Sequence, residues 1–291
     1  MKKCSVEEKL NLEVNKMTLF SESKYLKDLC DITFSSYEHG WDERNGGNVS
    51  IRLTEDDLSD FDDVSETKRE YDLGFDASAV SGQYFLVTGS GRYFRNVIKR
   101  PELDAGLVRI SDDGSKAELR WGFEDGAHPT SEFPTHLMSH IERLKADSSQ
   151  RVVMHCHPTN FVALSFTQDL DERSISRLLW KMQAESLVVF PEGIGIIPYM
   201  TPGTNEIGKA TAAKMADYRV VMWPHHGIFA VGSDPDETYG LIETVEKAAL
   251  IYSQICAQGG SVKQEITDEQ LHELADAFGV TGNPEFLDWN K

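Results

Sequence analysis

Two histidines separated by a single residue are the side chains best suited to chemistry in this sequence. His155 and His157 lie in an apolar run, residues 152–157, that reads as a β-strand. Because side chains alternate along a strand, both imidazoles project from one face, while Met154 and Cys156 point into the core. Two imidazoles at a strand end can share a metal ion. The same pair could also be two hydrogen-bonded histidines without a metal.

A third metal ligand would have to come from another segment. His226 follows a predicted strand over residues 220–223 and precedes Gly227, and His225 beside it is the competing candidate. Three neutral imidazoles leave Zn²⁺ its full charge and one open coordination position. Such an ion is suited to stabilising an oxyanion.

A carboxylate stands at the start of a predicted helix, over residues 130–146. Thr130 or Ser131 can cap this helix through its hydroxyl, and Glu132 follows directly. The positive end of the helix dipole favours an anion there. The same arrangement is also typical of an ordinary helix cap.

Two glycine-rich turns adjoin predicted strands, at residues 45–48 (NGGN) and 88–91 (TGSG). Glycine permits close backbone approach, so amides in such turns can bind an anion. Neither turn matches the dinucleotide or P-loop fingerprint. Together with Thr130 and Ser131 they predict a phosphate site built from neutral donors, with Arg44 and Arg92 near in sequence.

The composition excludes several kinds of partner. The 291 residues carry a formal net charge of −19, which repels nucleic acids and anionic membranes. Four scattered cysteines form no CxxC pair, and no signal peptide or membrane span is recognisable, so we expect a cytoplasmic protein. A small anionic substrate remains compatible with an uncharged binding site.

Predicted strands alternate with predicted helices, which indicates an α/β fold with helices covering a central sheet. Hairpin-like strand pairs favour a mixed, largely antiparallel sheet. No linker divides the chain, so we expect a single domain over residues 1–291. Within it we expect an N-terminal helical segment at about 5–38 and an acidic surface excursion at about 54–76. A further strand is predicted over residues 187–190.

Six sequence blocks in order resemble the class II aldolase/adducin family. They are GWDERNGGN, FLVTGSGRYFRN, HPTSEFPTH, VVMHCHPTN, ESLVVFPEGIGIIPYMTPGTNEIG and VMWPHHGIF, and the resemblance runs from about Gly40 to about Ala257. It implies a three-layer α/β/α domain around a mixed sheet, assembled as a homotetramer with one zinc ion per subunit.

The resemblance also implies roles for individual residues. The zinc ligands would be His155, His157 and His226, which favours His226 over His225. The catalytic carboxylate would be Glu132, and Glu185 would act across a subunit interface. The implied phosphate-binding residues are Asn45, Gly47, Asn48, Ser90, Thr130 and Ser131.

The implied activity is zinc-dependent, reversible aldol cleavage of a ketose 1-phosphate. We expect L-rhamnulose 1-phosphate as substrate, and dihydroxyacetone phosphate and L-lactaldehyde as products. The alternatives are an aldolase for fuculose or ribulose phosphate, a pentulose-phosphate 4-epimerase and, more distantly, a non-catalytic adducin-like scaffold.

Overall fold

A single open sheet organises the part of the chain that the structure describes. The structure is a computed structural model, and it describes residues 18–287. Within that range nine strands are ordered β2-β5-β4-β3-β1-β6-β9-β8-β7. All neighbouring strands are antiparallel except β7 and β8, which are parallel. The strands are β1 (Asn48–Leu53), β2 (Arg69–Asp72), β3 (Tyr84–Thr88), β4 (Ala105–Ile110), β5 (Lys116–Gly122), β6 (Val152–Cys156), β7 (Gly195–Ile196), β8 (Val220–Trp223) and β9 (Gly227–Gly232).

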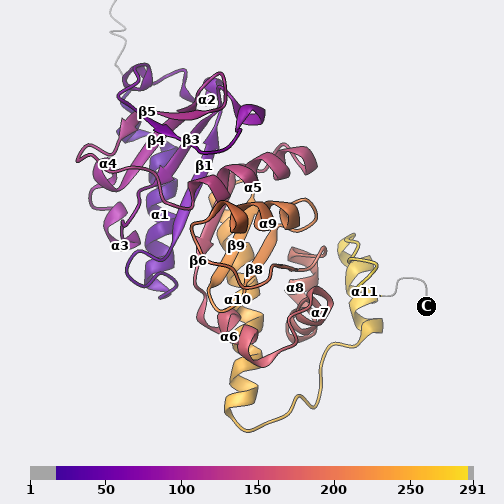
Figure 1. Cartoon of the computed structure of the whole chain (residues 1–291). Coiled ribbons are helices and arrows are strands. Elements are labelled where there is room, and N and C mark those ends of the chain that lie inside the picture. Colours follow the sequence, from indigo (N-terminus) through magenta and orange to yellow (C-terminus); the bar gives the residue numbers. More distant parts are fainter. Residues whose placement is uncertain (1–17, 288–291) are drawn as a thin grey trace, which may run out of the picture.

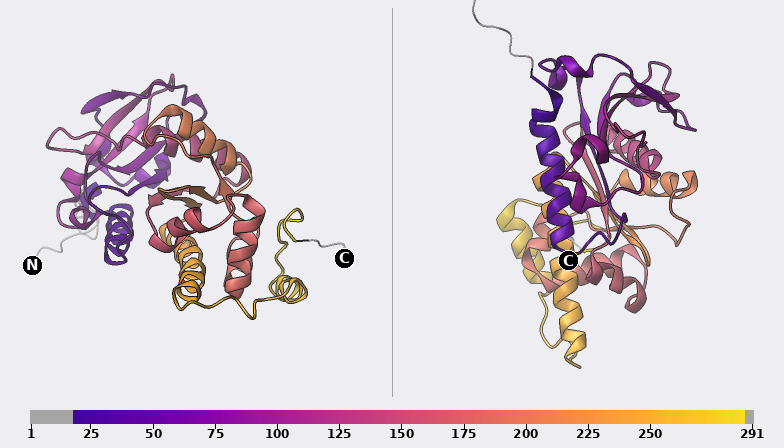
Figure 2. Two further views of the ribbon diagram at one scale, coloured as in Figure 1. Left: turned by 60° about the horizontal axis from the view of Figure 1, so that its bottom comes forward. Right: turned by 90° about the vertical axis from the view of Figure 1, so that its left-hand side faces the viewer.

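Helices cover both faces of the sheet (Figures 1 and 2). On one face α5 and α9 pack side by side. On the other face lie α1, α10 and the helices that follow β6. The longer helices are α1 (Lys24–Glu38), α5 (Phe133–Ala146), α6 (Thr159–Thr167), α7 (Glu172–Met182), α8 (Ala184–Val189), α9 (Asn205–Met215), α10 (Pro235–Ala257) and α11 (Asp268–Phe278), and the short ones are α2 (Glu55–Leu58), α3 (Phe94–Val97) and α4 (Pro101–Asp104). The predicted α/β class with helices around a mixed, largely antiparallel sheet is therefore confirmed.

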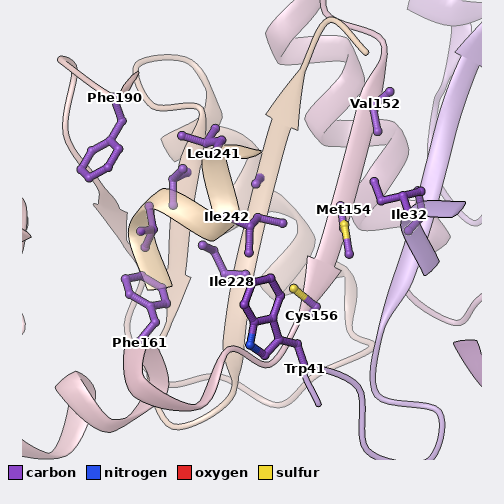
Figure 3. Packing of buried hydrophobic residues seen from close by; sticks show 14 of the residues in the cluster. Ile32, Trp41, Val152, Met154, Cys156, Phe161, Phe190, Ile228, Leu241 and Ile242 are labelled. Atoms are coloured by element: carbon purple, nitrogen blue, oxygen red, sulfur yellow. The ribbon is translucent and has the colours of Figure 1, made fainter. Parts of the chain in front are cut away.

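Alternation along β6 divides its side chains between the two faces of the sheet. Met154 and Cys156 are fully buried and belong to the large apolar cluster beneath α10, where Figure 3 shows them with Trp41 and Ile228. Val153 belongs to a different cluster on the opposite face, with side chains of β8, β9 and α9. His155 lies two residues further along and shares that opposite face, as the period of two requires.

The predicted strand over residues 187–190 is wrong. Residues 184–189 form helix α8, in which Ser186 and Leu187 are buried. The segment packs against α7, α10 and α11 rather than pairing with a strand. Strand propensity reflects how a side chain fits a pleated surface, and packing between helices overrides it here.

Two further segments differ in detail from the sequence-based expectations. Of the N-terminal helical segment, residues 5–17 lie outside the described residues, and the helix α1 begins only after Ser23, whose hydroxyl accepts from the amide of Leu26. The acidic stretch 54–76 contains α2 and strand β2, which forms one edge of the sheet. Most of its side chains are exposed, but Leu58 and Val64 anchor it to the core. Among the helices between residues 18 and 287, none has the length and apolar character needed to cross a bilayer.

Candidate active site

The structure brings three histidines into one cluster, two from the end of β6 and one from the turn between β8 and β9. The Nε2 atom of His155 lies 3.2 Å from Nε2 of His157 and 3.3 Å from Nε2 of His226. With a Zn–N bond of 2.0–2.1 Å, a tetrahedral ion separates its ligand atoms by about 3.3 Å. In the described part of the chain this trio forms a set whose ligand atoms all lie within 4.8 Å of one another. The spacing fits a zinc ion.

In two of the three rings, hydrogen bonds fix which nitrogen faces the cluster. Nδ1 of His155 donates to the carbonyl oxygen of Ile228 at 2.8 Å, and Nδ1 of His157 donates to the Glu43 carboxylate at 2.9 Å. Each Nε2 atom therefore keeps its lone pair for a metal ion. Burial and the neighbouring imidazoles hold the pKa of His155 well below its usual range and lower that of His226 to about 4, so both rings are neutral, as metal-binding imidazoles must be.

His225 is excluded from the cluster by its backbone. Its φ of +63° places it in the left-handed region, which turns its side chain away from that of His226. Its ring instead packs on Phe166 at 4.3 Å between centroids, and its Nδ1 lies 3.1 Å from the hydroxyl oxygen of Ser165. The geometry thus separates two neighbours that spacing alone left as alternatives.

Glu132 lies beside the histidine cluster. One of its oxygens, Oε2, is 3.8 Å from Nε2 of His155 and accepts a hydrogen bond of 2.7 Å from the amide of Asn48. The side chain is buried, and burial raises the pKa of Glu132 to about 7, against the opposing effect of the Asn48 hydrogen bond. A carboxyl group with this pKa can both give and take a proton near neutral pH.

The predicted cap of helix α5 is wrong in position. The helix begins at Phe133, its N-cap residue is Glu132, and no side chain caps it. Thr130 accepts from the amide of Glu132 at 3.4 Å, one residue before the helix. Pro134 occupies the first turn, where its missing N–H costs no hydrogen bond. Thr130 and Ser131 therefore stand at the rim of a pocket rather than on the helix.

The six predicted phosphate-binding residues line one cavity of about 220 Å³, next to Glu132 and His226. Some predicted donors are already engaged: the amides of Ser90 and Thr130 donate to the carbonyl oxygens of His128 and Thr88. Within residues 18–287 the side-chain donors of Asn45, Ser90 and Ser131 have no hydrogen-bond partner. The complete lining is Asn45, Gly46, Gly47, Asn48, Gly89, Ser90, Gly91, Thr130, Ser131, Glu132, His157, Pro202 and His226. Those free hydroxyl and amide groups are neutral donors suited to an anion.

Neither nearby arginine lines this pocket. Arg92 donates to both oxygens of Asp125, at 2.6 and 2.7 Å, and approaches Asp104 at 3.4 Å. Arg44 is exposed, has a φ of +57° and does not line the cavity. No lysine or arginine is found among the described residues that form the cavity wall.

Glu185, the other predicted catalytic residue, lies outside the cavity. Glu185 lies in the first turn of α8, is exposed, and does not line the cavity. Conversely, Glu43 was not among the predicted site residues, although it lies inside the GWDERNGGN block. Its contact with His157 joins residues 114 positions apart, which no local spacing reveals.

The fold and site define the class of protein: the chain belongs to the class II aldolase and adducin family. A model of the "Class II Aldolase and Adducin N-terminal domain" matches residues 27–253. Particular relatives carry the name rhamnulose-1-phosphate aldolase. That of Listeria monocytogenes serovar 1/2a is 50% identical over 266 residues, 91% of this chain and 97% of the relative. That of Mannheimia succiniciproducens is 43% identical over 261 residues, 89% of this chain and 96% of the relative.

Solved structures agree with this assignment. A sugar-phosphate aldolase from Thermotoga maritima superposes with a TM-score of 0.70 at 30% identity, covering 81% of this chain and 96% of the other. An L-fuculose 1-phosphate aldolase gives a TM-score of 0.58 at 20% identity over 89% of this chain and 97% of the other, which supports the shared fold alone.

Proposed function

We propose that this protein catalyses the reversible aldol cleavage of L-rhamnulose 1-phosphate to dihydroxyacetone phosphate and L-lactaldehyde. The relatives named for this sugar phosphate match about nine-tenths of the chain at half identity. One observation carries the proposal: three convergent imidazoles, the buried Glu132 and a pocket of neutral donors suited to an anion lie next to one another. A metal site without substrate chemistry would need neither of the last two.

In this proposal His155, His157 and His226 hold a zinc ion. Bound there, zinc supplies a Lewis acid that stabilises the negative charge developing on the substrate oxygens during carbon–carbon bond cleavage. The pocket at Asn45, Ser90 and Ser131 binds the phosphate group and so positions the ketose beside Glu132.

Glu132 is proposed to transfer a proton to and from the reacting carbon atom. After cleavage it delivers a proton to the carbon atom that has lost its bond to the aldehyde fragment, and in the synthetic direction it removes that proton. Its burial and its pKa of about 7 support both directions. The hydrogen bond from Asn48 holds one carboxyl oxygen, leaving the other for the substrate.

The aldehyde end of the substrate is assigned to a second subunit. Glu185 is exposed and outside the cavity, so it can reach a site only in an assembly, and we propose a homotetramer in which the partner subunit's Glu185 approaches the aldehyde oxygen. The proposal also places the enzyme in the cytoplasm, where its sugar phosphate would be found.

The test combines metal analysis with product identification. We expect one zinc ion per chain, loss of cleavage on exhaustive chelation, and recovery on adding zinc. A panel of L-rhamnulose, L-fuculose and ribulose phosphates should show the highest kcat/KM for the first. Full activity after metal removal would refute the zinc mechanism, and preference for another ketose would reassign the substrate.

A further inference from the structure

A line of buried polar groups leads inward from Glu132. Nδ2 of Asn48 lies 2.7 Å from Oε2 of Glu132, and Oδ1 of Asn48 lies 2.5 Å from Nε2 of His136. Nδ1 of His136 lies 2.8 Å from the hydroxyl oxygen of Ser50, which lies 2.8 Å from Nε2 of His140. All five side chains are at least nine-tenths buried.

Secondary structure places these groups in two facing rows. Asn48 and Ser50 are two residues apart on β1, and His136 and His140 are four residues apart on α5. Each spacing puts both members on one face of its element. The rows meet beneath the pocket, and Asn48 also pairs in register with His155 on β6.

Every proton in this line can be assigned from donor and acceptor chemistry. The carbonyl oxygen of Asn48 can only accept, so Nε2 of His136 must carry a hydrogen atom. Burial lowers the pKa of His136 to about 3, so the ring is neutral and its Nδ1 must accept from the hydroxyl of Ser50.

The same logic continues to the end of the line. The hydroxyl hydrogen of Ser50 is used, so its oxygen accepts from Nε2–H of His140. Burial holds the pKa of His140 well below its usual range, so its Nδ1 is a bare lone pair, and that atom has no partner among the described residues. All hydrogen bonds therefore point in one direction, toward Glu132.

We propose that His136 is a positioning residue that fixes the side-chain amide of Asn48, and through it the orientation of Glu132. The proposal rests on the proposed function of Glu132 as the proton-transferring group. Nδ2 of Asn48 carries two hydrogen atoms, one for Glu132 and one for the pocket that Asn48 lines. With the amide rotated by half a turn, its carbonyl oxygen would face both the Glu132 carboxylate and the phosphate site, and each contact would be repulsive.

Two substitutions at one position separate this role from packing. His136→Gln keeps a donor near the place of Nε2 and can still hold Asn48. His136→Asn is too short to reach Asn48 but keeps an acceptor near the place of Nδ1 for Ser50. Both are neutral, polar and smaller than histidine, so each serves as the other's control.

The measurement is the exchange of the carbon-bound proton of dihydroxyacetone phosphate with deuterated water, because this half-reaction needs Glu132 but no aldehyde. We expect His136→Asn to slow exchange roughly tenfold or more, and His136→Gln to slow it about threefold at most. Zinc content should equal that of the unsubstituted protein in both variants. The KM for dihydroxyacetone phosphate should also rise in His136→Asn, because a rotated Asn48 amide turns its oxygen toward the phosphate site, and it should stay nearly unchanged in His136→Gln.

Equal losses in both variants would overturn the positioning role. If the unsubstituted protein itself failed to exchange the proton, the proposed function would fail and this inference with it. A neutron diffraction structure of the unsubstituted protein tests the inference without either variant. We expect deuterons on Nε2 of His136 and His140, and a deuteron on Nδ1 of His136 would refute the assignment.

Discussion

At the scale of single residues, Glu132 is the side chain whose removal has the most specific consequence. We expect Glu132→Gln to keep its zinc ion and lose about two to four orders of magnitude in kcat, because an amide cannot exchange the proton. Steady-state rates and metal content measured on one preparation test this.

Glu246 provides the matched control for Glu132. It is another buried glutamate, but it accepts hydrogen bonds from Asn160 and Phe161 at the start of α6, away from the cavity. Glu246→Gln should lower the thermal stability and leave kcat nearly unchanged. Similar losses of kcat in the two variants would mean that Glu132 acts through stability.

The carboxylate of Glu43 orients His157, one of the three proposed metal ligands, and is not itself in the cluster. Its hydrogen bond of 2.9 Å fixes Nδ1–H of His157. We expect Glu43→Ala to weaken zinc affinity by roughly 10- to 100-fold, because the ring loses its fixed orientation and a basic partner. Competition with a chelating dye measures this, and Glu66→Ala, at an exposed glutamate outside the cavity, should have no effect.

The residues of the site differ in how far sequence could predict them. The pairing of His155 and His157 followed from the period of a strand. Spacing left His225 and His226 as alternatives, and the family resemblance favoured His226. The left-handed backbone at His225 supplies the physical reason, which spacing does not show. Glu43 and His136 act through partners that are 114 and 88 positions away. Such contacts depend on the sheet topology, which a single sequence does not display.

At the scale of secondary-structure elements, the start of β9 constrains the shape of the proposed metal site. A Cβ atom on Gly227 would lie 2.4 Å from the carbonyl oxygen of Cys156 and 2.8 Å from Cδ2 of His157. We expect Gly227→Ala to destabilise the fold by about 1–3 kcal/mol, because the neighbouring backbone must shift, and to lower zinc content.

For Gly240 in helix α10 we expect the same substitution to have the opposite effect on stability. Nothing lies within 4 Å of the position where its Cβ would be. Alanine in a helix interior is favoured over glycine, so Gly240→Ala should stabilise the protein by about 0.5–1 kcal/mol. Urea unfolding of both variants provides the comparison, and a stable, zinc-replete Gly227→Ala protein would contradict the geometry.

The contact between α5 and β1 makes stability depend on pH. The pKa of His140 is held well below its usual range by burial, so the unfolded chain binds a proton that the folded chain does not. The contribution of His140 to the free energy of unfolding is therefore fully present above the unfolded pKa of about 6.5. It is lost progressively as the pH falls below that value. His140→Gln should therefore reduce the slope of unfolding free energy against pH, at about pH 5, by up to about 1.4 kcal/mol per unit.

Denaturant titrations at several pH values between about 5 and 8 test this slope. The unsubstituted protein is the reference, because all other titrating groups contribute equally to both proteins. Parallel curves for the two proteins would show that His140 takes up a proton in the folded state.

Elements with a clear hydrophobic period or a bounded apolar run could be predicted from the sequence. Elements whose structure depends on the segments packed against them could not. Strand β6 ends one residue before the predicted strand over residues 152–157, and β8 has the predicted bounds, 220–223. β9 is bounded by Gly227 and Gly232, which also read as turns, and β7 has only two residues. Residues 184–189 form a helix because helices surround them.

At the scale of the whole molecule, the strongly negative net charge contrasts with a pocket suited to binding an anion. The chain carries a formal net charge of −19, and the wall of its anion pocket has neither lysine nor arginine among the described residues. An anionic substrate must therefore approach against the field of the protein.

Salt should relieve this repulsion. Raising sodium chloride from about 10 mM to about 150 mM shortens the screening length from about 30 Å to about 8 Å. We expect kcat/KM for the sugar phosphate to rise, whereas the KM for the uncharged L-lactaldehyde in the synthetic direction should not change. A fall in kcat/KM for the sugar phosphate would indicate that cations outside the pocket attract the substrate.

The order of strands also has a consequence for the growing chain on the ribosome. β1 pairs with β3 on one side and with β6 on the other, and about 100 residues separate Leu53 from Val152. At about 5 to 20 residues per second, those residues take roughly 5 to 20 seconds to add. The three imidazoles cannot meet until His226 has also emerged. During that interval the strand that becomes the middle of the sheet is an open edge, available to any other chain that offers a strand.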